Sequence, residues 1–185
     1  MNSAHRWLLV LLLAAAAAVA GPATLLAQSP RSETFTATAE REGRTASVTL
    51  IINSYSNQDD KKKLEAALEK GGQSELLSAL DSMHRGRLAF SGNVGRDINY
   101  VRSRQTPQGR TLFIISTRFL SFFELSRGER SRDYPFSVIR LTIDHNGRGA
   151  GTMVPAAQIH FTRSHKIRIE PYDQIPVRLL SVRAH

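Results

Sequence analysis

Glu124 is the carboxylate whose surroundings in the sequence best suit acid–base chemistry. It follows an apolar run that contains Phe119, Leu120, Phe122 and Phe123. A carboxyl group held among apolar side chains has a raised pKa and can act as a general acid. The same glutamate could instead be the solvent-facing edge of an amphipathic segment or the partner of an arginine. The sequence brings no second carboxylate beside it, so Glu124 is the only catalytic candidate of a hydrolase with a dispersed site, and the non-enzymatic interpretation is favoured.

Three arginines, Arg127, Arg130 and Arg132, lie close together in a charged segment, 126–133. They are the candidate binding residues for an anionic lipid, lipopolysaccharide or an acidic polysaccharide. No aromatic residue alternates with them, whereas proteins that bind single-stranded nucleic acid use such rings for base stacking. Nucleic acid is therefore an unfavoured partner. The other concentrated basic group, at 61–63, lies on a predicted helix and is explained by a solvated helix face.

The segment Asp144-x-Asn146-Gly147-x-Gly149 resembles part of a calcium-binding loop. Such a loop needs oxygen ligands at its first, third and fifth positions and a bidentate glutamate at its twelfth. Here the fifth position is Arg148 and the twelfth is Pro155, and the flanking segments read as strands. The six histidines show no metal-binding spacing, and the chain has no cysteine. The sequence therefore predicts a turn here, with no metal site and no cofactor.

The N-terminus predicts export. Arg6 precedes an uncharged run rich in leucine and alanine, which is typical of a secretory signal peptide. We expect residues 1–27 to be this signal, with cleavage at some point in 20–27, and a secreted or periplasmic protein. An uncleaved anchor is the alternative. The formal net charge is +9, about +8 without Arg6, and arginines supply 20 of the 25 basic residues, so the exported protein is basic.

The remainder, 28–185, reads as a single β-rich domain. Short segments with alternating apolar residues and turn signals predict antiparallel strands, beginning with a hairpin from 33–39 and 45–53. Between about 57 and 83 the period changes to that of a helix. Asn57 is a plausible N-cap, and Gly71-Gly72 would end a first helix and leave room for a second. The fold class is therefore α+β, mainly antiparallel β, as a sandwich or partly open barrel with an inserted two-helix hairpin.

The clearest β-hairpin is centred on Asn146-Gly147, a dipeptide that suits a two-residue type I′ turn. With that turn, Ile143 would pair with Ala150, Leu141 with Thr152 and Ile139 with Val154. All six side chains would then share one face of the sheet, so this register is self-consistent.

Four segments together resemble an uncharacterised group of small secreted bacterial proteins. They are Ser121-Phe122-Phe123-Glu124-Leu125, Asp133-Tyr134-Pro135-Phe136, the run from Gly149 to Ala157 (GAGTMVPAA), and Pro176-Val177-Arg178-Leu179-Leu180. The resemblance implies export and a shared domain, and it brings no activity or ligand with it. The expected function is an exported, non-enzymatic domain that binds an anionic or amphipathic component of the cell envelope. A hydrolase, or a structural partner that uses an exposed sheet edge in an envelope complex, are the alternatives.

Overall fold

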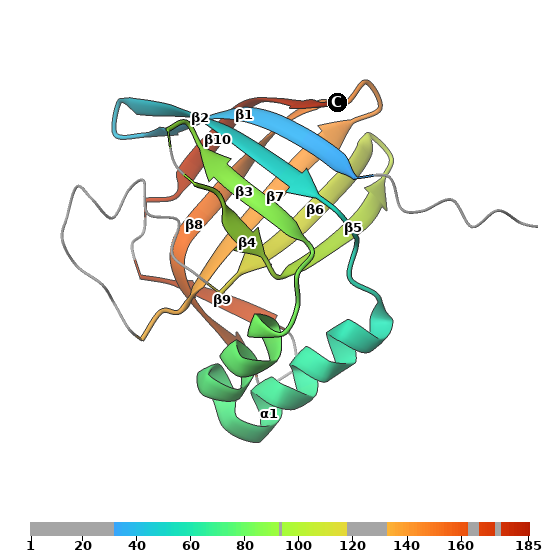
Figure 1. The fold of residues 1–185 in the computed structure, drawn as a ribbon, viewed down its shortest axis with the longest axis vertical. Coiled ribbons are helices and arrows are strands. Elements are labelled where there is room, and N and C mark those ends of the chain that lie inside the picture. Colours follow the sequence, from blue (N-terminus) through green and yellow to red (C-terminus); the bar gives the residue numbers. More distant parts are fainter. Residues whose placement is uncertain (1–31, 93, 118–132, 163–166, 173–174) are drawn as a thin grey trace, which may run out of the picture.

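A computed structural model describes residues 32–92, 94–117, 133–162, 167–172 and 175–185. Over these residues the chain forms ten antiparallel strands and one helix (Figure 1). The strands are β1 (Glu33–Arg41), β2 (Arg44–Ile52), β3 (Gly86–Phe90), β4 (Arg96–Ile98), β5 (Tyr100–Thr106), β6 (Gly109–Ser116), β7 (Phe136–Asp144), β8 (Arg148–Phe161), β9 (Ile167–Pro171) and β10 (Val177–Ala184). The prediction of a mainly antiparallel β fold is confirmed.

The sheet curls into a nearly closed barrel. Its strand order is β4-β3-β2-β1-β10-β8-β7-β6-β5, with β9 paired to β8 beside this path. The first and last strands of the order, β4 and β5, are separated in the chain by Asn99 alone. The backbone N–H of Asn99 donates to the carbonyl of Ile115 in β6 at 3.0 Å. The two ends of the sheet therefore meet at Asn99, which decides between the sandwich and the barrel that the sequence left open.

The barrel interior is filled with side chains. Alternate residues of each strand point inward, including Phe35, Leu50, Leu112, Ile114 and Leu141, all fully buried. This inward set is the period-two pattern expected of a sheet with one dry face.

The helix α1 (Gln58–Asp81) begins at the predicted N-cap. The side chain of Asn57 accepts from the backbone of Asp60 at 2.8 Å, and the Asp60 carboxylate accepts from the backbone of Asn57 at 2.9 Å. The predicted two-helix hairpin is wrong, because one helix spans the region. Gly71 and Gly72 have non-helical backbone angles and make a sharp kink rather than an end. A φ of +63° at Gly72 is one that glycine adopts without the steric cost of a Cβ.

The β7–β8 hairpin is confirmed, but its predicted register is wrong by one residue. Ile143 pairs with Gly149, Leu141 with Gly151 and Ile139 with Met153. The connection has three residues, because the Asp144 carboxylate accepts from the backbone N–H groups of Asn146 and Arg148 and draws the loop around itself.

The shift by one residue exchanges the two faces of β8. Met153 now points into the barrel, whereas Ala150 and Thr152 lie on the outer surface. Only glycine fits at the inward-facing positions 149 and 151, because a Cβ on either residue would lie 2.4 Å or less from a carbonyl oxygen of β7.

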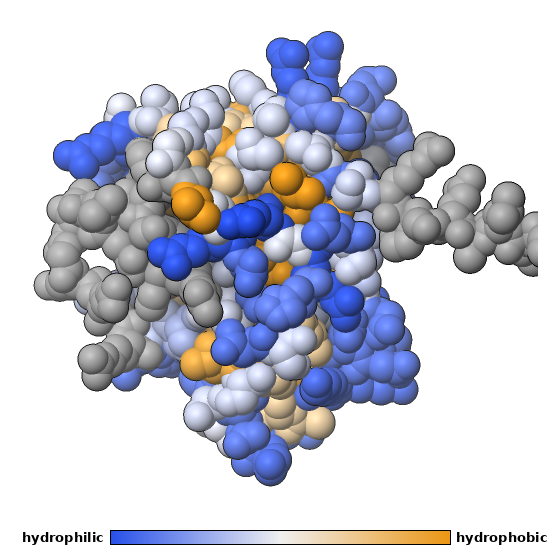
Figure 2. Space-filling view, viewed as in Figure 1, coloured by the Kyte–Doolittle hydropathy of each residue, from blue (hydrophilic) through white to orange (hydrophobic). Residues whose placement is uncertain are grey.

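A second buried cluster joins α1 to the outside of the barrel. Leu64, Leu68, Leu76 and Leu80 form the apolar face of the helix and pack against outward-facing residues of the sheet, which include Tyr100, Phe136, Val138 and Ile159. On the face shown in Figure 2, over β2, β3 and β4, the surface is mostly hydrophilic, with hydrophobic residues in small separate spots. The helix therefore covers one part of the outer sheet and leaves the rest exposed.

Candidate functional site

The site residues predicted from the sequence, Glu124, Arg127, Arg130 and Arg132, lie outside the described residues, as does the predicted signal 1–27. The described part of the chain offers three other arrangements of functional interest. They are a polar cluster at one end of the barrel, an apolar groove beside α1, and an arginine-rich part of the outer sheet.

The polar cluster joins opposite walls of the barrel at one of its ends. The two terminal guanidinium nitrogens of Arg110, on β6, donate to the two carboxylate oxygens of Glu33, on β1. The Tyr55 hydroxyl donates to Glu33 at 3.0 Å, and the same Arg110 lies over the ring of Phe35, 5.6 Å from its centroid. These groups belong to the inward-facing set, so they cover the apolar core at that end.

The protonation states in this cluster suit a stabilising ion pair rather than an acid–base catalyst. The hydrogen bond from Arg110 holds the pKa of Glu33 below its usual range, and the hydrogen bond to Glu33 raises the pKa of Arg110. Burial raises the pKa of Tyr55 to about 12. At neutral pH the carboxylate is therefore ionised and occupied by its arginine, and the tyrosine keeps its proton. A general base needs a pKa near the working pH, which none of the three groups has.

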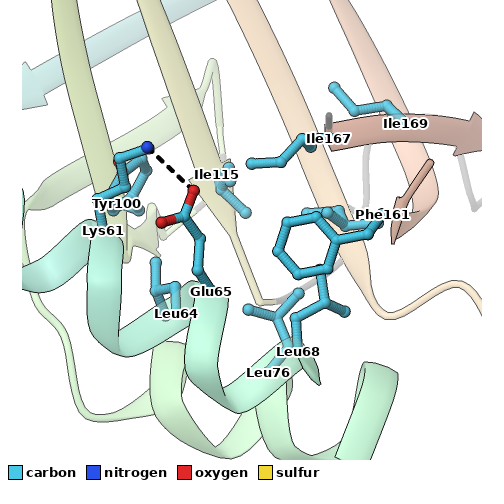
Figure 3. Close-up of a pocket in the computed structure, with 11 residues that line it drawn as sticks. Lys61, Leu64, Glu65, Leu68, Leu76, Tyr100, Ile115, Phe161, Ile167 and Ile169 are labelled. Atoms are coloured by element: carbon cyan, nitrogen blue, oxygen red, sulfur yellow. Dashed lines mark ion pairs between the residues drawn. The ribbon is translucent and has the colours of Figure 1, made fainter. Parts of the chain in front are cut away.

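The apolar groove lies between α1, β9 and the outer face of the sheet (Figure 3). The side chains that line it are almost all apolar: Leu64, Leu68, Leu76, Tyr100, Ile115, Ile159, Phe161, Ile167 and Ile169. The ring of Phe161 lies between Leu68 of α1 and Ile167 of β9. Ile167 is 53% exposed and Ile169 is 40% exposed, so the β9 side of the groove is open to solvent.

One ion pair borders the groove. Lys61 Nζ lies 3.0 Å from Glu65 Oε1, and both side chains come from the first turns of α1 (Figure 3). The cavity volume is about 90 Å³. Sites that enclose a whole small molecule have volumes of about 300–1,000 Å³. The groove can therefore take the end of an alkyl chain or one large side chain, and it cannot enclose a metabolite.

The sheet register places arginines directly beside the groove on the same outer face. Tyr100 pairs with Ile115, and both line the groove. Two residues further along the strands, Arg102 pairs with Phe113 and Phe113 with Arg140. Adjacent strands lie about 4.8 Å apart, so the two arginines flank Phe113 at about 10 Å from one another. Phe113 is 39% exposed.

The same face continues with further arginines across the sheet. Arg140 pairs with Thr152 and Thr152 with Arg178, while Arg183 pairs directly with Arg148 on the next strand. We call the outward-facing set the arginine face; it consists of Arg102, Arg104, Arg140, Arg148, Arg178 and Arg183. It extends over β5, β6, β7, β8 and β10.

Most of this positive charge is uncompensated within the described residues. Arg178 pairs with Glu40 at 2.6 Å, and the side chain of Arg102 donates to the start of α1. The other four arginines, Arg104, Arg140, Arg148 and Arg183, form no ion pair with a described carboxylate. Like charges directly opposite on neighbouring strands are destabilising, as at Arg148 and Arg183. An anion bound between them would remove that repulsion.

Reasoning from the sequence missed the arginine face because the arginines come from four separate strands. The alternation in each strand marks which residues point outward, so Arg140 and Arg178 could each be assigned to the solvent face of its own strand. Only the strand order shows that the solvent faces of these strands form one continuous surface.

Over the described residues, no group of three or more histidine, aspartate and glutamate side chains is arranged to hold a metal ion. No helix in the described part of the chain combines the length and the apolar character needed to cross a bilayer. Comparison with known proteins found no matching family model, no matching curated protein and no matching solved structure.

Proposed function

We propose that this protein is an exported, non-enzymatic domain that binds an anionic amphiphile of the cell envelope, such as an anionic lipid or lipopolysaccharide. One observation carries the proposal: one outer face of the barrel holds an exposed apolar groove and four arginines that form no ion pair with a described carboxylate. The acidic groups of the ligand would contact the arginine face. The end of one apolar chain would enter the groove beside Phe161.

The size of the groove favours a ligand that is presented by a surface. Because the groove volume is about 90 Å³, it can bury only a few methylene groups. Each buried methylene contributes about 0.8 kcal/mol, so the groove alone supports weak binding. Each basic residue near an anionic membrane contributes about 1 kcal/mol at physiological ionic strength. Several arginines of the arginine face together with a partial chain insertion would give useful affinity, and neither contribution would be sufficient alone.

The proposal is tested by co-sedimentation with vesicles. We expect the purified protein to bind vesicles of phosphatidylglycerol and phosphatidylcholine, and to bind pure phosphatidylcholine vesicles much more weakly. Arg140→Gln should weaken binding about fivefold, the equivalent of about 1 kcal/mol. Binding should also fall as salt rises from low to moderate concentration, because exposed charges are screened over about 10 Å at 0.1 M salt.

Arg44→Gln is the matched control. Arg44 is exposed at the tip of the β1–β2 hairpin, outside the arginine face, and its replacement changes the net charge by the same amount. If the two variants lost binding equally, the loss would be explained by the change in net charge alone, and the proposal of a defined site would be contradicted. Phe113→Ser tests the apolar contribution, and unchanged binding there would exclude Phe113 as a contact. Parallel titrations with lipopolysaccharide and with a soluble acidic polysaccharide separate an amphiphile from a simple polyanion.

A further inference from the structure

Among the described strands, β9 is an edge strand that pairs on one side only. It pairs with β8 through Ala157↔Pro171, Ile159↔Ile169 and Phe161↔Ile167, and no other described strand pairs with it. Exposed edges with apolar residues are templates for another strand, and proteins usually protect them with charges, proline or a covering segment. Here two exposed isoleucines alternate with Arg168 and Glu170.

The hydrogen-bonding phase of β9 identifies which backbone groups face that edge. Tyr172 N–H donates to the carbonyl of Ala156 at 2.9 Å, so this pair is a hydrogen-bonded one. Hydrogen-bonded and non-hydrogen-bonded pairs alternate along antiparallel strands. The Ile169 and Ile159 pair is therefore non-hydrogen-bonded, and the N–H and C=O of Ile169 point away from β8.

An independent contact supports this phase. The backbone of Ile159 is bonded on its far side by the side-chain amide of Gln73, which accepts from Ile159 N–H at 3.0 Å and donates to its carbonyl at 2.5 Å. Gln73 follows the kink in α1, so the helix supplies hydrogen-bond partners to the backbone of β8 on the side away from β9. For the corresponding groups of Ile167 and Ile169 no hydrogen-bond partner exists among the described residues.

The side chains of β9 are self-complementary about Ile169. Two β9 strands related by a twofold axis through the Ile169 pair would place each Arg168 opposite the partner's Glu170. The alternative register, centred on Arg168, would place two arginines opposite one another. Opposite charges in directly facing cross-strand positions are favourable and like charges are unfavourable.

This register also uses the free backbone groups. Two hydrogen bonds would join the two Ile169 residues, and each Ile167 N–H would donate to the partner's Pro171 carbonyl. Pro171 has no N–H to offer, so the pairing would end there. Within its own protomer Glu170 lies 3.7 Å from His160, and its side chain is 46% exposed, which leaves it accessible to a second arginine.

We propose that the β9 edge is a homodimer interface, in which two copies of this chain pair their β9 strands antiparallel about Ile169. The charge complementarity between Arg168 and Glu170 selects a second copy as the occupant. The dimer would be symmetric, because the same strand serves on both sides. This inference does not rest on the proposed ligand site: Ile167 and Ile169 also line the groove, but the arginines of the arginine face lie on other strands.

Charge exchange gives the sharpest test. Sedimentation equilibrium over a wide concentration range should show a monomer–dimer equilibrium for the purified protein. Arg168→Glu and Glu170→Arg should each weaken dimerisation at least tenfold, because each places like charges across the interface. The double variant Arg168→Glu/Glu170→Arg should restore it. A protein that stays monomeric at all concentrations, or a dimer that neither single variant affects, would overturn the proposal.

Backbone and cross-linking variants provide the second test. Ile169→Pro removes an edge-facing donor without removing a β8 ladder bond, whereas Ile169→Ala loses the same side chain and keeps the donor. Dimerisation should therefore be weaker in the proline variant than in the alanine variant.

The chain has no cysteine, so Ile169→Cys introduces a single thiol. Facing Cα atoms would be about 5.5 Å apart, within disulfide range. Mild oxidation should cross-link this variant, and Thr142→Cys, which is exposed near the C-terminal end of β7, should remain uncross-linked.

The outcomes separate the two proposals. Arg140→Gln should leave the dimer unchanged while it weakens vesicle binding. Equal cross-linking at Ile169→Cys and Thr142→Cys would indicate random collision and overturn the β9 interface. Capture of an extended peptide at the β9 edge of a monomeric protein would also overturn it, because the occupant would then be a different chain.

Discussion

At the scale of single residues, the most informative group is the Glu33–Tyr55–Arg110 cluster. It brings together a β1 carboxylate, a β6 guanidinium and a hydroxyl that follows β2. A guanidinium and a carboxylate over an apolar core lose hydration, and their mutual contacts offset that loss only when both are present. The cluster therefore stabilises this end of the barrel, and its two charges are paired with one another.

Glu33→Gln should lower the free energy of unfolding at pH 7 by about 1–2 kcal/mol, a value reduced because the pair is partly exposed. The folded-state pKa of Glu33 is lowered by its hydrogen bond from Arg110, so its contribution is complete above the usual glutamate pKa of about 4.3. It is lost as the pH falls through the lower folded-state value. Urea unfolding of both proteins from pH 7 to pH 3 should show their difference shrinking at the acid end.

Glu69→Gln is the control for this measurement. Glu69 is exposed on α1 and lies in no ion pair with a described residue. Its replacement should change the unfolding free energy little at any pH. A difference between wild type and Glu33→Gln that stayed constant down to pH 3 would contradict the role of the ionised carboxylate.

At the scale of elements, the kink of α1 determines what the helix covers. The break at Gly71 and Gly72 turns the second half of the helix back, so that leucines from both halves line the same groove. It also places Gln73 against the backbone of Ile159. The kink thus places hydrogen-bond partners beside the backbone of Ile159 and brings together the leucines that line the apolar groove.

Gly72→Ala should destabilise the protein by about 1–3 kcal/mol, because a side chain at this φ and ψ is strained. Thermal or urea unfolding measures the loss. Glu69→Ala, in regular helix before the kink, should change stability by no more than about 0.5 kcal/mol. An equally small effect of Gly72→Ala would mean that the kink relaxes into continuous helix.

At the scale of the whole molecule, Asn99 closes the barrel and anchors the helix. Its side chain is 2% exposed and donates to the carbonyls of Leu80 and Met83, at 3.2 and 2.9 Å. Its amide oxygen accepts from the backbone of Thr117 at 2.9 Å. One residue therefore connects the junction of β4 and β5, the end of α1 and the residue that follows β6.

Asn99→Ala should lower the free energy of unfolding by about 2–4 kcal/mol, because several buried backbone groups lose their partner at once. Hydrogen exchange should quicken both at the end of α1 and beside β6. Ser47→Ala, on the exposed outer face of β2, should leave both regions protected. Faster exchange in α1 alone would show that the barrel closes without the Asn99 side chain.

The sequence was most successful where the determinants are local. Alternating apolar residues identified the β1–β2 hairpin and the strands of the β7–β8 hairpin. Asn57 was recognised as the N-cap of α1. Two predictions failed. The Asp144 carboxylate accepts from the backbone N–H groups of Asn146 and Arg148, and the three-residue loop that results shifts the register by one residue. At Gly71 and Gly72 the non-helical backbone angles kink α1 instead of ending it.

The sequence by itself determined that this is a basic, cysteine-free chain of antiparallel strands with a helical insertion, because composition and periodicity are properties of neighbouring residues. Tertiary structure decided the rest. Barrel closure, the groove beside α1 and the arginine face depend on which strands are neighbours. Strand order is set by pairing between residues up to 149 positions apart, as for Phe35 and Ala184, and no local pattern encodes it.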